Sequence, residues 1–273
     1  MKQALRNPLA LIGFAIIAGI LLLALLAPLI APYDPNAINV KAILLAPELK
    51  HWMGTDGLGR DVFSRMLYGG RISLLVGFVA VGIATIIGIV LGAVAGFYRG
   101  WVDTVIMRTV DVMLSIPTFF LILAVIAFLT PSIWNIMIVI GLTSWMGVTR
   151  LVRAEFLSLR NREFVLAAQA LGAKDARLIF THLLPNSLTP IIVSSILGIA
   201  SAVLVESGLS FLGLGVQAPQ ASWGNILTDG KEYIQFAWWL SLFPGLAILL
   251  TVLGYNLLGD GLRDAYNPRS SHH

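Results

Sequence analysis

Six long apolar runs alternate with polar connections along the 273 residues of this chain. A helix needs about 20 residues to cross roughly 30 Å of hydrocarbon, and each run is close to that length. The pattern predicts an all-α, polytopic membrane protein with six transmembrane helices, placed at residues 9–31, 72–97, 104–129, 132–149, 188–212 and 237–258. The first run exceeds the apolar core of about 7 to 15 residues in a signal peptide, so we expect a retained anchor.

Composition agrees with this pattern. Hydrophobic residues make up 58% of the chain and charged residues 12%, against about 25% charged residues in a typical soluble domain. The absence of cysteine excludes disulfides and cysteine-based metal or redox sites. The basic residues behind the net charge of +4 lie beside apolar runs and not in an aromatic-rich patch, which indicates membrane topology and not nucleic-acid binding.

The distribution of Lys and Arg predicts the orientation in the membrane. If the N-terminus is cytoplasmic, 12 of the 18 lie inside: Lys2, Arg6, Arg99, Arg108, Arg150, Arg153, Arg160, Arg162, Lys174, Arg177, Arg263 and Arg269. The other six lie outside: Lys41, Lys50, Arg60, Arg65, Arg71 and Lys231. We therefore expect one transmembrane domain, residues 1–273, in the cell (inner or plasma) membrane, with both termini cytoplasmic.

The long external connection, residues 32–70, contains a compact charged segment. Three glycines at positions 54, 57 and 59 predict turns, and residues 61–66 suit a short interfacial helix before the second span. Four charged side chains are expected to form salt bridges that hold this loop against the membrane surface: Asp56, Arg60, Asp61 and Arg65.

The polar connection at residues 150–186 predicts two short helices joined at Gly172. Asn161 is expected to cap the first helix, with Glu163 in its first turn, and Gly172 to provide a left-handed stop. Phe164, Ala168 and Leu171 would share one face, next to the small side chain of Ala167. Such a face favours contact with another protein; an amphipathic helix lying on the membrane surface is the alternative.

These residues resemble the cytoplasmic coupling loop of binding-protein-dependent ABC importer permeases. The family motif is Glu-Ala-Ala, three residues, Gly, about nine residues, an aliphatic, one residue and Leu-Pro. Ala167, Ala168, Gly172, Leu184 and Pro185 match this spacing, whereas Leu166 and His182 depart from it. The resemblance implies that an ATPase subunit contacts the loop, and the candidate coupling residues are Glu163, Phe164, Ala167, Ala168, Gly172 and Arg177.

Further motifs are similar to the dipeptide, oligopeptide and nickel branch of these permeases: residues 54–65, 216–224 and 256–264. The branch implies the transmembrane-domain fold of a type I ABC importer. It also implies a second permease subunit, two ATPase subunits and an extracytoplasmic substrate-binding protein as partners. Peptides are the implied cargo, and nickel or a nickel chelate is the alternative.

Three features inside the second and third runs predict helix packing. Gly88, Gly92 and Gly96 recur at spacing four, which lets two helices approach closely. Asp103, Arg108 and Asp111 open the third run, where Arg108 and Asp111 share a helical face and are expected to pair. Pro117 follows and should kink the helix, with ordinary packing favoured over gating as its consequence.

Glu206 is the carboxylate placed deepest in an apolar run. A lone acid there costs about 2.5–3.5 kcal/mol on insertion scales, unless it meets water or a partner. Glu206 therefore either lines the pathway or is hydrogen-bonded near a helix end without touching substrate. At the start of the same run, Thr189 is expected to cap the helix, with Pro190 at the first helical position.

No catalytic, cofactor or metal site is predicted in this chain. The sequence contains neither a Gly-x-x-x-x-Gly-Lys-Ser/Thr phosphate loop nor a His-Glu-x-x-His motif, and no histidine falls inside an apolar run. ATP and magnesium would be bound by the partner subunits. A stand-alone secondary transporter or channel is the alternative from another class, but the chain shows one intramembrane charge and no internal repeat.

Overall fold

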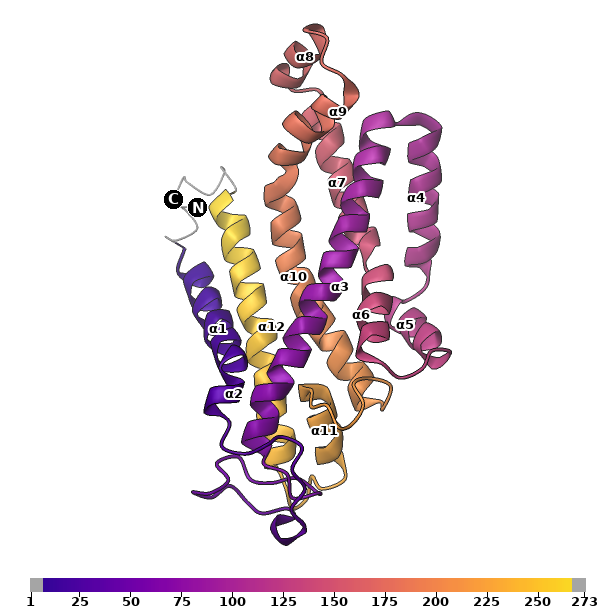
Figure 1. Ribbon diagram of the computed structural model, residues 1–273. Helices are drawn as coiled ribbons and strands as arrows, with labels where there is room; N and C mark the ends of the chain where they lie inside the picture. Colours follow the sequence, from indigo (N-terminus) through magenta and orange to yellow (C-terminus); the bar gives the residue numbers. More distant parts are fainter. Residues whose placement is uncertain (1–6, 267–273) are drawn as a thin grey trace.

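The computed structural model describes residues 7–266, and this part of the chain is built of helices (Figure 1). The longer helices are α1 (Pro8–Leu25), α3 (Val62–Tyr98), α4 (Gly100–Ser115), α7 (Trp145–Arg160), α10 (Leu184–Phe211) and α12 (Trp239–Tyr266). Shorter elements connect them: α2 (Ala27–Ile30), α5 (Thr118–Ala127), α6 (Ile133–Leu142), α8 (Glu163–Ala170), α9 (Asp175–Arg177), a π-helix (Leu178–Leu183) and α11 (Trp223–Lys231). Lys2, Arg6 and Arg269, used above for orientation, lie outside the described residues.

Five helical segments are long and apolar enough to cross a membrane: Pro8–Leu25, Val62–Tyr98, Ile133–Arg160, Asp175–Phe211 and Trp239–Ala265. A sixth arises if Gly100–Ser115 and Thr118–Ala127, which are bent by 82°, count as one span. The predicted all-α membrane fold is confirmed. Several helices continue past the apolar runs, because their polar end residues find partners in loops and neighbouring helices.

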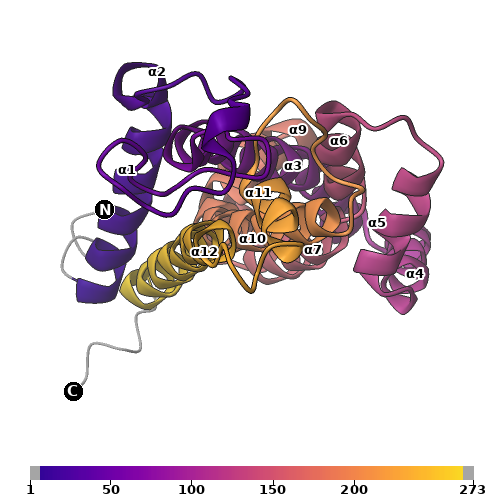
Figure 2. The ribbon, with the colours of Figure 1, turned by 90° about the horizontal axis from the view of Figure 1, so that it is seen from below.

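The α3 helix occupies the centre of the molecule, in contact with α7, α10 and α6 (Figure 1). Viewed end-on, α1 and α12 form one flank and α4 with α5 the other (Figure 2). The start of α1 and the end of α12 point towards the end of the molecule that carries α8. Residues 31–61 and α11 lie at the opposite end (Figure 1).

The predicted interfacial helix at residues 61–66 is wrong as a separate element, because these residues open α3. Asp61 caps the helix by accepting a hydrogen bond from the backbone N–H of Ser64 at 2.8 Å. Gly69 and Gly70 do not interrupt the helix. A Cβ at Gly70 would lie 3.0 Å from the Trp223 ring, so these glycines let α11 approach.

The glycine repeat in α3 forms the contact with α7, as predicted. A Cβ at Gly88 would lie 2.5 Å from the Cβ of Val148, and one at Gly92 would lie 2.6 Å from the carbonyl oxygen of Thr149. Real Cβ atoms do not approach other heavy atoms so closely, so only glycine permits this separation of the two backbones. Gly96 repeats the arrangement one turn later against Phe156.

Pro117 breaks the chain between α4 and α5, where the predicted kink becomes a bend of 82°. The predicted pairing of Arg108 with Asp111 is wrong. Asp111 accepts from the Nη2 of Arg150 at 2.6 Å, and Asp103 accepts from the Nη2 of Arg153 at 2.6 Å. Both arginines belong to α7, so these ion pairs attach α4 to the bundle.

The expected start of the fifth span at Thr189 and Pro190 is also wrong. The α10 helix begins at Leu184 with Pro185 in its first turn, and Pro190 lies inside it. A π-helix at Leu178–Leu183 leads directly into α10. Residues Asp175–Phe211 therefore form one continuous helical segment, because the polar side chains after Pro185 do not interrupt the helix.

Substituting Gly92→Ala should lower the stability of the protein, although alanine favours a helix by about 1 kcal/mol over glycine. The added methyl group would overlap Thr149 and Val152, and such overpacking costs about 1–3 kcal/mol. Thermal unfolding in detergent should show a melting temperature lower by several degrees. Gly82→Ala is the matched control, because a Cβ there meets nothing within 4 Å. Equal melting temperatures for both variants would contradict the packing account.

Candidate functional site

The segment that follows α7 projects from one end of the molecule as α8 and α9 (Figure 1). Asn161 does not cap α8 as predicted, because Asn161 ends α7. The residue before α8 is Arg162, whose backbone is extended and whose side chain makes no capping bond. Glu163 lies in the first turn of α8, where its negative charge is favourable beside the helix N-terminus.

Gly172 ends α8 in the left-handed conformation that the sequence predicts, with φ of +82°. The N–H of Gly172 bonds to the carbonyl of Gln169 at 3.0 Å, and the N–H of Ala173 bonds to that of Ala168 at 3.1 Å. A Cβ at Gly172 would meet nothing within 4 Å. The requirement for glycine is therefore conformational and not one of space.

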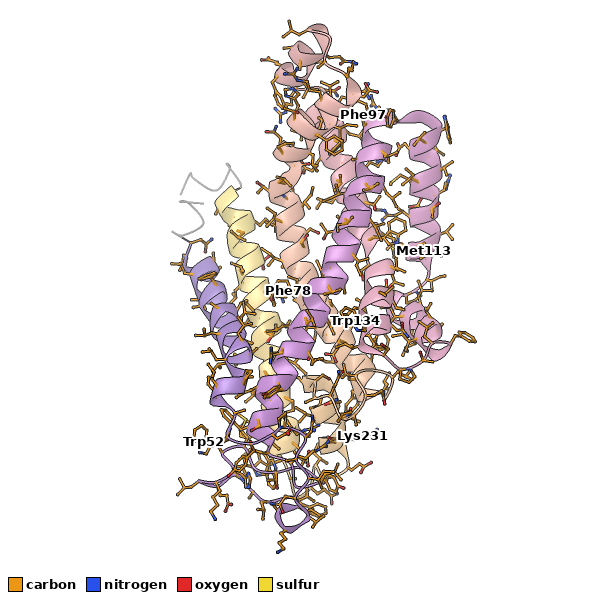
Figure 3. All side chains as sticks on the ribbon, viewed as in Figure 1. Trp52, Phe78, Phe97, Met113, Trp134 and Lys231 are labelled. Carbon is orange, nitrogen blue, oxygen red and sulfur yellow. The ribbon has the colours of Figure 1, made fainter. Side chains whose placement is uncertain are left out.

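One side of α8 is anchored and the other is free in the described chain. Val165 is 1% exposed and belongs to an apolar cluster with Phe97 of α3, Phe156 of α7 and Leu183. Figure 3 shows Phe97 at this end of α3, far from Trp52 in the external loop. Of the six candidate coupling residues, Ala168 is partly buried and the other five are exposed: Glu163, Phe164, Ala167, Gly172 and Arg177.

The predicted apolar face of Phe164, Ala168 and Leu171 is thus only partly a free surface. Phe164 is 43% exposed and Leu171 is 90% exposed, whereas Ala168 packs against the cluster around Val165. Phe180, which the sequence did not single out, is 68% exposed on the neighbouring π-helix. Large apolar side chains therefore protrude at a polar end of the molecule, which is typical of an interaction surface.

At the opposite end, the predicted charged cluster is buried and divides into two networks. Asp56, which is fully buried, accepts from the Nε of Arg60 at 2.6 Å, and the Nε of Arg65 lies 3.4 Å from the same oxygen. Asp229 of α11 joins both arginines, at 3.2 Å from Arg60 and 3.4 Å from Arg65. Asp61 belongs to the other network, because it caps α3 and pairs with the Nδ1 of His51 at 2.8 Å.

The charge of Asp229 depends on these neighbours. Burial raises the pKa of the Asp229 carboxyl above its usual value, while the arginines Arg65 and Arg60 oppose this shift. The sequence did not predict Asp229, because more than 160 residues separate it from its partners. The network joins the external loop, the start of α3 and α11 into one unit.

Glu206 is fully buried inside the bundle and lines no open pathway in this conformation. Its carboxylate accepts hydrogen bonds from Ser73 of α3 at 3.1 Å and from Ser210 of α10 at 2.7 Å. The hydroxyl of Ser73 accepts from the backbone N–H of Trp223, and that of Ser210 from Val216. This geometry favours the hydrogen-bonded alternative, and the pathway-lining role stays a prediction.

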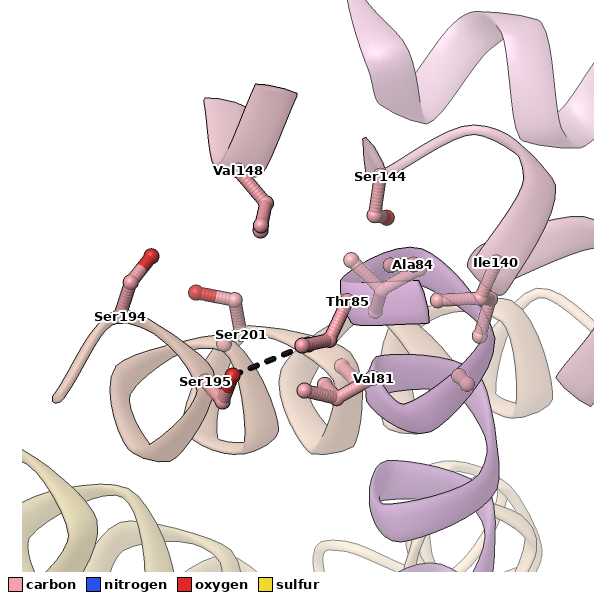
Figure 4. Close-up of a pocket in the computed structure, with 13 residues that line it drawn as sticks. Val81, Ala84, Thr85, Ile140, Ser144, Val148, Ser194, Ser195 and Ser201 are labelled. Atoms are coloured by element: carbon pink, nitrogen blue, oxygen red, sulfur yellow. Dashed lines mark hydrogen bonds between the residues drawn. The ribbon is translucent and has the colours of Figure 1, made fainter. Parts of the chain in front are cut away.

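A cavity of about 220 Å³ lies between α3, α6, the start of α7 and α10 (Figure 4). Hydroxyl groups from Thr85, Ser144, Ser194, Ser195 and Ser201 line it, together with small and aliphatic side chains. None of the lining residues is charged. This site could not be predicted from the sequence, because single serines in apolar runs carry no signal until the helices bring them together.

Comparison with known proteins identifies the class of this fold. Residues 88–272 match the family described as binding-protein-dependent transport system inner membrane component, and residues 1–47 match the N-terminal TM domain of oligopeptide transport permease C. The chain therefore belongs to the family of inner-membrane components of binding-protein-dependent transport systems. It is a multi-pass inner-membrane protein of the permease type.

Individual relatives extend over nearly the whole chain. The dipeptide transport system permease protein DppC of Alkalihalophilus pseudofirmus is 47% identical over 98% of this chain and 88% of its own length. The probable D,D-dipeptide transport system permease protein DdpC of Escherichia coli is 45% identical, covering 97% and 89%. The oligopeptide transport system permease protein OppC of Bacillus subtilis is 40% identical, covering 98% and 88%.

A solved structure shares the fold. A chain of the MetNI methionine ABC transporter superposes with a TM-score of 0.62, over 76% of this chain and 98% of that chain, at 17% identity. The predicted fold, that of an ABC importer transmembrane domain, is confirmed.

Substituting Asp56→Asn should strongly destabilise the end of the molecule that carries α11. The substitution leaves the buried Arg60 and Arg65 without the negative charge of the carboxylate that both contact. Loss of one partner of a buried ion pair costs about 3–5 kcal/mol. The melting temperature in detergent should fall well below that of Glu48→Gln, a control at an exposed position of the same loop. Asp229→Asn should cost less, because 39% of its side chain is exposed. An unchanged melting temperature for Asp56→Asn would show that the network adds nothing to stability.

Two substitutions of Glu206 distinguish its role as a hydrogen-bond acceptor from the role of its negative charge. Glu206→Leu leaves the hydroxyls of Ser73 and Ser210 without their acceptor, at about 1–3 kcal/mol for each unsatisfied buried group. Glu206→Gln keeps one carbonyl oxygen and a similar shape. We expect a clearly lower melting temperature for the Leu variant than for the Gln variant. The reverse order would mean that the serines do not depend on this side chain.

Proposed function

We propose that this chain is the membrane-spanning permease subunit of an ATP-driven importer of dipeptides or oligopeptides. The proposed cargo is supported by the similarity, over almost the full length, to relatives named as dipeptide and oligopeptide permeases. The relatives named above favour peptides over nickel or a nickel chelate. The comparisons give no support to a stand-alone secondary transporter or channel.

The proposed partners follow from the family and the shape of the chain. A second permease subunit would complete the translocation pathway, and two ATPase subunits would bind ATP and magnesium and contact the 162–182 segments. An extracytoplasmic binding protein would deliver peptide to the end formed by residues 31–61 and α11. In this arrangement the ATPase reaction belongs to the partners and not to this chain.

The anchoring of α8 supports a role in coupling. Val165 fixes α8 to side chains of α3, α7 and the π-helix, so a displacement of α8 is transmitted to the helices that form the centre of the bundle. Phe164, Leu166 and Leu171 remain exposed for contact with an ATPase subunit. Closure of the ATPases on ATP would move the α8 helices together and rock the two bundles between inward-open and outward-open states.

The orientation follows from the same assignment. The end that carries α8 would face the cytoplasm, with the start of α1 and the end of α12 on that side (Figure 1). The end of α7 and the segment between α7 and α10 are also rich in basic residues: Arg160, Arg162, Lys174 and Arg177. Basic residues flanking membrane spans favour the cytoplasmic side, which supports the orientation independently.

Gly172 provides a test of coupling. In the complex reconstituted in liposomes, Gly172→Leu should leave ATP hydrolysis measurable but reduce peptide uptake per ATP at least severalfold, because leucine strains the left-handed turn that sets α8 against the π-helix. Gly172→Asn is the matched control, since asparagine tolerates this conformation. Normal uptake per ATP by the Leu variant, with equal expression and membrane insertion, would refute the assignment of this loop.

A further inference from the structure

The hydroxyl-lined cavity in the middle of the bundle has free hydrogen-bonding capacity. Ser195 is already engaged, because its hydroxyl bonds to Thr85 at 2.9 Å and donates to the carbonyl of Ile191 (Figure 4). The hydroxyls of Ser144 and Ser194 form no hydrogen bond with any described residue of the chain. Ser201 reaches the carbonyl of Leu197 at 3.4 Å, and its side chain is exposed. The cavity therefore offers donors and acceptors to a ligand.

The lining of the cavity does not suit lipid. Hydrocarbon cannot satisfy hydroxyl groups, and polar groups left unpaired in an apolar medium are costly. The lipid-exposed surfaces of a membrane protein are expected to carry large apolar side chains, as the exposed positions Leu188, Ile192 and Leu204 of α10 do. Water or a polar ligand is the compatible occupant of the cavity.

The position of the cavity along the helices is typical of a substrate site in a transporter. Ser194, Ser195 and Ser201 lie near the middle of α10, and Thr85 lies well inside α3. Transporters commonly bind their substrates near the middle of the bilayer. A volume of about 220 Å³ falls short of the roughly 300 Å³ at which ligand pockets usually begin, as expected if a second subunit completes the site.

We propose that this cavity is the surface at which the chain contacts its peptide cargo during translocation, and that it pairs with the peptide backbone. This inference rests on the proposed function. A serine hydroxyl both donates and accepts, so it can pair with the N–H or the C=O of any peptide unit. Because no lining residue is charged, the contact does not discriminate between acidic, neutral and basic peptide side chains.

The chain contains no cysteine, so single cysteines can be introduced without background from it. We would reconstitute the complete complex with Ser194→Cys, Ser201→Cys or the control Leu204→Cys. A charged methanethiosulfonate reagent would then be added, and the modification of this chain measured by mass. The reagent reacts with thiolate, which requires water.

We expect Ser194→Cys and Ser201→Cys to be modified at least tenfold faster than Leu204→Cys, at an exposed apolar position of α10 that does not line the cavity. Saturating transported peptide should slow modification of the two cavity positions severalfold. Rates equal to the control, or rates that peptide does not change, would overturn the inference.

A charge placed in the cavity tests the contact with cargo directly. Ser201→Asp should reduce uptake of an acidic peptide about tenfold relative to a neutral peptide of equal length, whereas the control Ser201→Asn should leave that ratio unchanged. The ratio is unaffected by a general loss of folding or expression. An unchanged ratio in an active Ser201→Asp complex would contradict the inference.

The failure of this inference can be separated from a failure of the proposed function. If the unmodified complex takes up none of the peptides, the proposed cargo is wrong. If the unmodified complex transports peptides while the cavity cysteines react no faster than the control, only the cavity assignment is wrong.

Discussion

The close contact between α3 and α7 is the constraint on which the rest of the bundle depends. Apolar helices gain little by leaving lipid for one another, so close packing and internal hydrogen bonds must hold them together. At Gly88, Gly92 and Gly96 the backbone of α3 lies against α7 at separations that no larger residue permits. This contact fixes the position of α3, which runs from the apolar cluster that contains Phe97 to the charged network that contains Arg65.

Each functional region is attached to α3. At one end, Phe97 of α3 contributes to the apolar cluster that holds Val165 of α8. At the other end, Arg65 of α3 joins Asp56 and Asp229, and Ser73 of α3 bonds to Glu206. The hydroxyl-lined cavity lies between these attachments, and Thr85 of α3 lines it. The α3 helix therefore connects the cluster that holds α8 with the cavity and with the loops that surround α11.

The sequence predicts what depends on nearby residues. Apolar runs of sufficient length indicated the spans, the spacing of Gly88, Gly92 and Gly96 indicated a close helix contact, and Gly172 indicated a left-handed stop. The predictions were wrong where the partner of a side chain lies far away in the sequence. Nothing near Arg65 reveals Asp229, and the pairing of Asp103 with Arg153 depends on how α4 packs against α7. The cavity was missed for the same reason, since its hydroxyls come from separate helices.

If α8 is the contact surface for an ATPase subunit, a cross-link from α8 should capture that subunit. Leu171→Cys places a thiol at a position that is 90% exposed on the coupling segment, and Leu49→Cys places one at 95% exposure in the external loop as a control. Each variant would be treated with a short bifunctional reagent in its native membrane, purified in mild detergent, and its cross-linked partners identified by mass spectrometry. We expect a nucleotide-binding subunit to be linked at position 171 and not at position 49. Purification of the chain with no nucleotide-binding partner at position 171 would contradict the account.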